Sequence, residues 1–122
     1  MSACAGAAGV GGMTPAEINA AMPRPWGDRE ISRFQFRASL FARRGFAPER
    51  AEHLADRLAL RDMQGDDRRV CMECERLQAD HPKFGRGCFA AQQGWLGPGV
   101  PKSLNPLLDT LQRCERFTFQ RP

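Results

Sequence analysis

The stretch Val70-Cys71-Met72-Glu73-Cys74 decides how the second half of this chain is interpreted. Two residues separate its cysteines, so their sulfurs can reach a single ion from one tight turn. Cys88 and Cys114 follow, and the full spacing is C-x2-C-x13-C-x25-C. Zinc prefers four ligands in a tetrahedron and accepts thiolates readily. We therefore predict one structural zinc ion bound by Cys71, Cys74, Cys88 and Cys114.

Other interpretations of the same cysteines remain open. His81 lies between the pair and Cys88, so it could replace Cys114 as the fourth ligand, although Pro82 restricts its backbone. Four cysteines also suit an iron–sulfur cluster. A redox Cys-x-x-Cys would need a buried strand before it, and the preceding Asp-Asp-Arg-Arg does not resemble one. The remaining alternative is a set of reduced cysteines without any ligand.

The residues around the cysteines predict loops rather than regular elements. Glycines and prolines recur between Gly85 and Pro101 and are typical of tight turns. Only the leucines of 106–114 suggest a last short helix, and Phe117 and Phe119 alternate as in a short strand. Arginines flank the cysteines, and we expect their charge to favour thiolates over thiols.

The first half of the chain has helical signals. Residues 1–13 are small and glycine-rich, which predicts a disordered tail containing Cys4 as a bystander. Thr14 and Glu17 form a capping box for a short helix that the prolines after Met22 stop. Asp28 can cap a second helix that runs to about Arg44, with a glycine placed to end it.

A third helix is predicted from Pro48 to about Met63, joined to the second by a short turn as an αα-hairpin. In the second helix, Ile31, Phe34, Ala38 and Phe41 recur at helical spacing and form the expected core stripe. In the third, leucines and alanines form the stripe. The expected solvent-facing side of the third helix consists of Arg50, His53, Asp56, Arg57 and Arg61. We expect Asp62, beside Arg61, to form ion pairs rather than to act in catalysis.

An arginine-rich side of the second helix is the best candidate for binding. Phe36 and Leu40 interrupt it, and aromatic and arginine side chains together are typical of interface hot spots. Arginine also suits bidentate contact with phosphate. Near the cysteines, Trp95 either packs or stacks on a partner. The predicted binding residues are Arg33, Phe36, Arg37, Leu40, Arg44, Arg68, Arg69, Arg86 and Trp95.

The overall composition limits the classes of function. The net charge of the 122-residue chain is +4 and comes from arginine, which permits nucleic-acid binding. No apolar run is long enough for a membrane span, and the start lacks the pattern of a secretory signal, so we expect a cytoplasmic protein without a membrane partner. No histidine lies at a catalytic spacing from a serine or cysteine. We therefore expect a protein that is not an enzyme.

Several stretches resemble a known group of proteins. They are Phe41–Gly45, Ala51–Leu58, Arg61-Asp62, Asp66–Cys74 and Leu111–Cys114. Within about residues 28–119 the chain is similar to small cysteine-containing proteins encoded on bacterial plasmids, phages and integrated elements. The resemblance implies a bacterial or phage setting and supports treating the cysteines as one unit. It transfers no activity and no site.

Together these observations predict a mainly α fold. After the tail, we expect one small domain over residues 14–122, in which a helical hairpin (14–64) packs on a loop-rich, four-cysteine zinc module (65–122). The leading hypothesis for function is a zinc-stabilised binding module of a mobile element or phage that contacts DNA, RNA or a nucleoprotein complex. The alternative is a protein–protein adaptor or inhibitor that uses Phe36 and Leu40.

Overall fold

The structure is a computed structural model and describes residues 13–83, 85–98 and 103–120. These residues form two compact units, divided between Asp67 and Arg68, three residues after the predicted boundary. We call them the helical unit and the cysteine unit. The predicted tail and Cys4 lie almost entirely outside the described residues.

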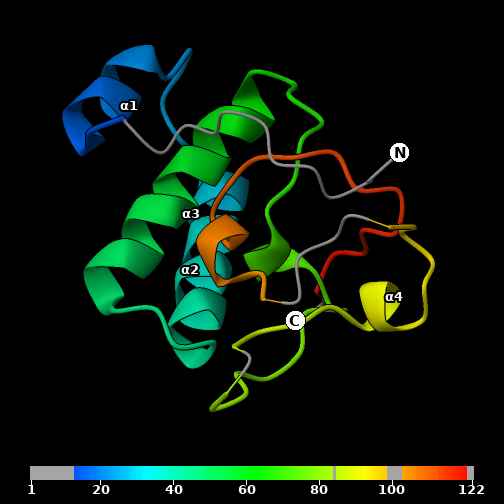
Figure 1. Ribbon diagram of the computed structural model, residues 1–122. Helices are drawn as coiled ribbons and strands as arrows, with labels where there is room; N and C mark the ends of the chain where they lie inside the picture. The colour runs from blue at the N-terminus through cyan, green and yellow to red at the C-terminus, as the bar shows by residue number, and fades with distance from the viewer. Residues whose placement is uncertain (1–12, 84, 99–102, 121–122) are drawn as a thin grey trace. The chain divides into compact units, whose positions relative to one another are not determined.

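The helices are labelled in Figure 1. The helical unit contains α1 (Pro15–Ala21), α2 (Asp28–Arg43) and α3 (Pro48–Met63). The cysteine unit contains the single-turn α4 (Phe89–Gln92) and the 3₁₀ turns Cys71–Glu73 and Asn105–Leu107. The described residues pair only as isolated antiparallel bridges, without a named strand. The prediction of a mainly helical fold is thus confirmed.

The first helix begins as its sequence predicts. The Thr14 hydroxyl accepts a hydrogen bond from the Glu17 N–H at 3.2 Å, and the Glu17 carboxylate accepts one from the Thr14 N–H at 3.0 Å. This capping box satisfies two N–H groups that a helix start leaves unpaired. The one buried residue of α1, Ile18, is fully shielded from solvent.

The second helix starts one residue differently from the prediction. Asp28 is its first residue and Gly27 is the N-cap, whose N–H donates to Glu30 Oε2 at 3.1 Å. Glu30 is held in place by an ion pair with Arg24 at 2.6 Å. The helix ends as predicted, because Gly45 adopts a φ of 104° that other residues avoid.

The predicted αα-hairpin is confirmed. Helix α3 spans the predicted residues, and α2 and α3 lie along each other with α1 also against α3 (Figure 1). Phe41 of α2 and Leu54 and Leu58 of α3 are among the most deeply buried side chains. Burial of each such side chain contributes about 1.5–3 kcal/mol to folding, which is why this apolar spacing specifies the hairpin.

The core stripe of α2 differs from the one predicted. The buried residues are Arg37, Leu40 and Phe41, whereas Ile31 is 43% exposed. The prediction placed Leu40 on the opposite side because it assigned every arginine to solvent. Phe36, its expected outward neighbour, is half-buried. The prediction that Leu40 belongs to an apolar outer face of α2 is therefore wrong.

The burial of Arg37 has a clear electrostatic reason. Its guanidinium donates to Asp62 Oδ2 of α3 at 2.7 Å, and Arg33 reaches the same oxygen at 3.2 Å. Arg61 donates to the other carboxylate oxygen from Nε and Nη2. Burial raises the pKa of Asp62, but the charges of Arg37 and Arg61 outweigh this and hold it below its ordinary value. The expected ion-pairing of Asp62 is confirmed.

Four of the five side chains of α3 that we expected in solvent are at least half-buried, and Asp56 is one of them. Arg57 is 3% exposed and Arg61 2% exposed. His53 Nε2 donates to the backbone carbonyl of Met13 at 2.8 Å, and so fixes the residue before the cap of α1. These predictions were wrong because periodicity cannot show that a polar side chain on a helix has a buried partner.

The cysteine unit is built mostly from turns and paired backbone. Its isolated bridges are Arg69↔Gln112, Cys74↔Phe119, Leu77↔Cys88 and His81↔Gly85. The helix predicted in 106–114 is wrong, because only Asn105–Leu107 turns helically and Gln112 is extended in a bridge. Phe119 is bridged to Cys74, and the rings of Phe117 and Phe119 meet edge to face with their centroids 4.8 Å apart, as side chains on the same side of an extended segment can.

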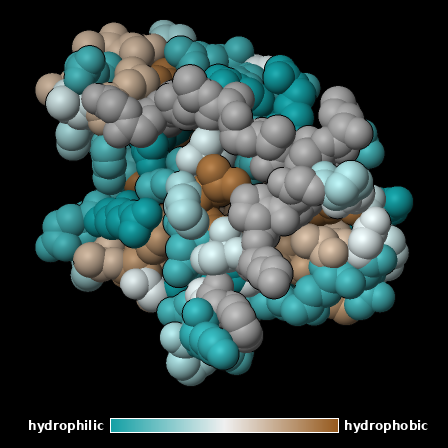
Figure 2. Space-filling view, in the orientation of Figure 1, coloured by the Kyte–Doolittle hydropathy of each residue, from teal (hydrophilic) through white to brown (hydrophobic). Residues whose placement is uncertain are grey.

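Most of the visible surface is hydrophilic. Figure 2 shows teal residues over most of the described part of this face, with brown residues in small separate areas. The most exposed large hydrophobic residues among those described are Ile31, Phe89, Trp95 and Phe119. Three of these four belong to the cysteine unit, which therefore presents most of the exposed aromatic surface.

Candidate metal centre

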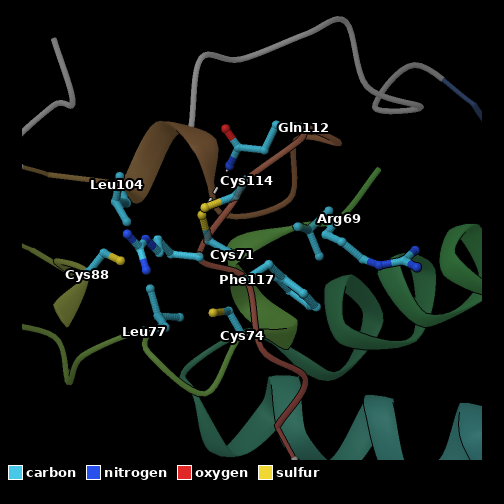
Figure 3. A pocket seen from close by; sticks show the side chains of 11 residues that line it. Arg69, Cys71, Cys74, Leu77, Cys88, Leu104, Gln112, Cys114 and Phe117 are labelled. Atoms are coloured by element: carbon cyan, nitrogen blue, oxygen red, sulfur yellow. Dashed lines mark hydrogen bonds between the residues drawn. The ribbon is translucent and has the colours of Figure 1, made fainter. Parts of the chain in front are cut away.

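The four predicted cysteine ligands surround one small cavity. Cys71, Cys74, Cys88 and Cys114 all line it, although they come from segments up to 43 residues apart in sequence. Figure 3 shows their sulfurs turned toward a common space. The cavity has a volume of about 20 Å³, enough for one water-sized sphere. The remaining lining residues are Arg69, Val70, Leu77, Leu104, Gln112, Arg116 and Phe117.

The close pair of cysteines is shaped by a 3₁₀ turn. The Cys74 N–H donates to the Cys71 carbonyl at 3.0 Å, which brings the two residues onto one side of the turn. Glu73 fixes the start of this turn, because its buried carboxylate accepts from the Val70 N–H at 3.1 Å. The sequence predicted the turn from the two-residue spacing.

Backbone pairing delivers the other two cysteines. Cys88 is bridged to Leu77, three residues after Cys74. Cys114 follows the bridge between Arg69 and Gln112, in which the two residues exchange hydrogen bonds of 2.7 and 2.8 Å. Each of these bridges lies within three residues of the cysteines it joins. The paired backbone therefore brings the four cysteines to one cavity.

The electrostatics of the cavity oppose free thiolates. Burial and, to a smaller extent, the neighbouring thiols of Cys74, Cys88 and Cys114 together raise the pKa of Cys71 to about 12. Burial also raises the pKa of Cys74. The prediction that flanking arginines favour the thiolates is thus wrong for the metal-free protein. A metal cation among the sulfurs would favour their thiolate forms.

Hydrogen-bond donors nevertheless point at two of the sulfurs. Gln112 Nε2 donates to Cys71 Sγ at 3.1 Å, drawn as a dashed line in Figure 3. The backbone N–H groups of Thr118 and Arg76 lower the pKa of Cys74 and partly offset its burial. Donors to sulfur stabilise thiolates and orient metal ligands. No sequence pattern indicates a role for Gln112, because its position depends on the bridge to Arg69.

The thiols are not yet in coordinating positions. None of the four forms a disulfide, and no three metal-ligating side chains of the described residues are arranged so that they could hold an ion as they stand. His81, the alternative ligand, is exposed, and its Nδ1 accepts from the Lys83 N–H at 3.0 Å. The cavity is lined by Cys114 instead, which favours the four-cysteine set over the set with histidine.

The predicted binding residues do not form one surface. Arg33 and Arg37 pair with Asp62 within the helical unit. Arg44 and Phe36 are half-buried and Leu40 is buried. In the cysteine unit, Arg68 is half-buried, Arg69 lines the cavity, and Arg86 donates to the Gln78 carbonyl at 2.8 Å. Trp95 is 44% exposed.

The comparisons with known proteins do not add to this picture. No protein family, curated protein or solved structure matches this chain. The resemblance to small proteins of mobile elements therefore stays a prediction. Among the helices that the structure describes, none has both the length and the apolar character needed to cross a membrane.

Proposed function

We propose that this protein is a non-enzymatic nucleic-acid-binding module whose cysteine unit is organised by one structural zinc ion. The ligands are Cys71, Cys74, Cys88 and Cys114. The single observation that carries this proposal is the convergence of these four thiols on one cavity.

The chemistry of the cavity supports a metal over a reactive thiol. A catalytic or redox cysteine needs a lowered pKa, whereas burial raises the pKa of Cys71 and Cys74. Zinc would offset the mutual repulsion of the four sulfurs and release their protons. Its apparent binding free energy of about 10–16 kcal/mol would add to the stability of a unit with few regular elements.

The distribution of charge supports nucleic acid as the partner of the cysteine unit. Residues 1–67 contain nine arginines and nine acidic residues, so their net charge is zero. Residues 68–122 contain nine basic and five acidic residues, which is the whole +4 of the chain. A basic surface attracts phosphates over distances of about 10 Å at moderate salt. We therefore assign the phosphate contacts to the cysteine unit rather than to α2, where the sequence suggested them.

The structure removes one of the two apolar residues on which the adaptor hypothesis depends. It required Phe36 and Leu40 to face outward together, but Leu40 is 5% exposed and Phe36 half-buried. No other observation favours a protein-binding face on α2. We therefore keep nucleic acid as the one proposed class of partner.

Two measurements on the purified full chain test the proposal. Elemental analysis should find one zinc per chain, removable by a strong chelator with loss of structure in the cysteine unit. Binding to fluorescent DNA and RNA strands should weaken steeply between about 50 and 200 mM salt, since phosphate contacts release counterions. A chain without stoichiometric metal would refute the centre, and a chain that binds no nucleic acid at low salt would refute the function.

A further inference from the structure

An exposed aromatic pair stands next to the candidate metal centre. Phe89, the first residue of α4, and Trp95 are each 44% exposed. Their rings meet edge to face, with centroids 5.6 Å apart and planes at 81°. Large aromatic side chains normally bury most of their area, so two of them half in solvent and in mutual contact form an unusual surface.

Two guanidinium groups flank the indole of Trp95. The Cζ atoms of Arg76 and Arg116 lie 5.5 and 5.4 Å from its ring centroid, within the range of cation–π attraction. Arg76 also donates to the backbone carbonyl of Arg116, which fixes the two arginine segments to each other. We call Arg76, Phe89, Trp95 and Arg116 the Trp95 surface. It combines an aromatic face with two positive charges.

The segment that carries Trp95 packs against residues around the cysteines. The backbone N–H of Trp95 donates to the backbone carbonyl of Ala90 at 3.0 Å and closes the turn after α4. Ala90 and Leu96 form a small buried cluster, and Cys88 and Cys114 pack against it. The segment that presents Trp95 therefore rests on two of the four proposed zinc ligands, and its position depends on theirs.

A groove adjoins this surface. It has a volume of about 570 Å³ and is lined by Glu75, Arg76, Leu77, Gln78, Phe89 and Gln120. Glu75 is the one acidic residue among these. The volume is within the range of about 300–1,000 Å³ that small organic groups occupy in proteins. A flat heteroaromatic group stacked on the aromatic pair would have space beside it for its sugar and phosphate.

We propose that the Trp95 surface is a stacking platform for the bases of single-stranded nucleic acid, with Arg76 and Arg116 contacting the phosphates. This inference rests on the proposed function and specifies its ligand. Aromatic side chains stack on any exposed base, and arginines beside them follow the backbone. The +4 charge of residues 68–122 supplies the complementarity to a polyanion.

The geometry favours a single strand over a duplex. Base faces in a duplex are already stacked on each other and are closed to a side chain, whereas single strands expose them. The described residues of the cysteine unit also contain no helix longer than the single turn of α4, so no helix is available to enter a major groove. A protein partner remains the alternative occupant that the test must separate.

The test uses the full, metal-loaded chain and three probes of equal length. The probes are a single-stranded oligothymidylate, its duplex with oligoadenylate, and an abasic strand with the same phosphates but no bases. We expect the oligothymidylate to bind most tightly. Trp95→Ala should weaken its binding roughly 5- to 140-fold, the value of one stacked base, and should leave the abasic strand unaffected. Oligouridylate in the same assay separates RNA from DNA.

A fluorescence measurement keeps the test valid if Trp95→Ala fails to fold. The chain has two tryptophans, so Trp26→Phe leaves Trp95 as the only indole. Stacking of a base should then quench its emission, while the abasic strand should not. Chelation of the metal should remove the quenching, because the Trp95 segment packs on Cys88 and Cys114. Ile31→Ala, which removes an equally exposed side chain of the helical unit, is the matched control.

The outcomes separate this inference from the function it rests on. If Trp95→Ala binds normally while the double change Arg76→Glu, Arg116→Glu abolishes binding, the platform is refuted and nucleic-acid binding stands. Equal binding of the abasic strand or of the duplex also refutes the platform. If no probe binds at low salt, both proposals fail. Recovery of a protein ligand that resists nuclease and requires Trp95 would assign the surface to a protein instead.

Discussion

Replacing Gln112 with leucine should weaken zinc binding without destabilising the metal-free chain. Gln112 is 1% exposed, and its Nε2 donates to Cys71 Sγ at 3.1 Å. A hydrogen bond to a charged partner contributes about 1.5–3 kcal/mol, and it gains this strength only when the sulfur is a thiolate. Loss of the donor should therefore weaken zinc binding about 10- to 100-fold, as for other donors behind metal ligands.

The same substitution has the opposite effect on the chain without metal. Gln112 Oε1 is buried and has no hydrogen-bond partner in the described part of the chain. Burial of an unpaired polar atom costs about 1–3 kcal/mol, and leucine removes that cost. The free-energy cost of burying Gln112 Oε1 is the same with and without zinc. It therefore does not change the affinity for the metal. We expect Gln112→Leu to leave the metal-free protein as stable as the wild type or more stable.

Competition with a chromophoric chelator measures the affinity, and thermal melts with and without chelator measure the stability. Gln93→Leu is the matched control, because Gln93 is exposed and belongs to the same unit. Unchanged zinc affinity in Gln112→Leu would show that the hydrogen bond does not stabilise a thiolate. A lower melting temperature only in the absence of zinc would instead give Gln112 a packing role, and our reasoning would be refuted.

Three other substitutions have defined outcomes. The pKa of Asp62 is lower in the folded chain than in the unfolded chain, so ionised Asp62 stabilises the fold. This stabilisation is complete above the unfolded pKa and is lost as the pH falls below about 4. Asp62→Asn should therefore make stability less dependent on pH in this acidic range, measured by unfolding monitored by circular dichroism. Arg37→Glu, which puts a buried carboxylate beside Asp62, should cost at least about 3–5 kcal/mol in chemical denaturation, whereas the more exposed Arg33→Glu should cost much less. Cys114→Ser should weaken cobalt or zinc binding and reduce the sulfur–cobalt absorption, because one of four thiolates is lost, while His81→Ala should change neither. The reverse result would make His81 the fourth ligand.

The helices could be predicted because their signals are local. Thr14, Pro48 and Gly45 act through their own backbone or a residue three positions away, so no tertiary information is needed. The buried face of α2 could not be predicted in the same way. Arg37 is buried because Asp62, 25 residues later, receives it, and hydrophobic periodicity does not record a partner on another helix.

That the four cysteines come together could be predicted, but the residues around their cavity could not. Cysteine spacing identified four residues that the structure brings to one cavity. Gln112 and the aromatic pair of Phe89 and Trp95 depend on backbone bridges and on a turn closed by Ala90. Such pairings link residues tens of positions apart, so residue types at fixed spacings do not reveal them. The same limit explains the helix wrongly expected near Leu111.

The partition of charge between the two units has a kinetic consequence. A chain with all of its excess charge in one half is drawn to a polyanion by that half, so encounter is guided by the field as well as by diffusion. Guided encounters raise association rates above the usual 10⁵–10⁷ M⁻¹s⁻¹ for unguided docking and slow down as ions are added. The first half has no net charge and adds little to this attraction.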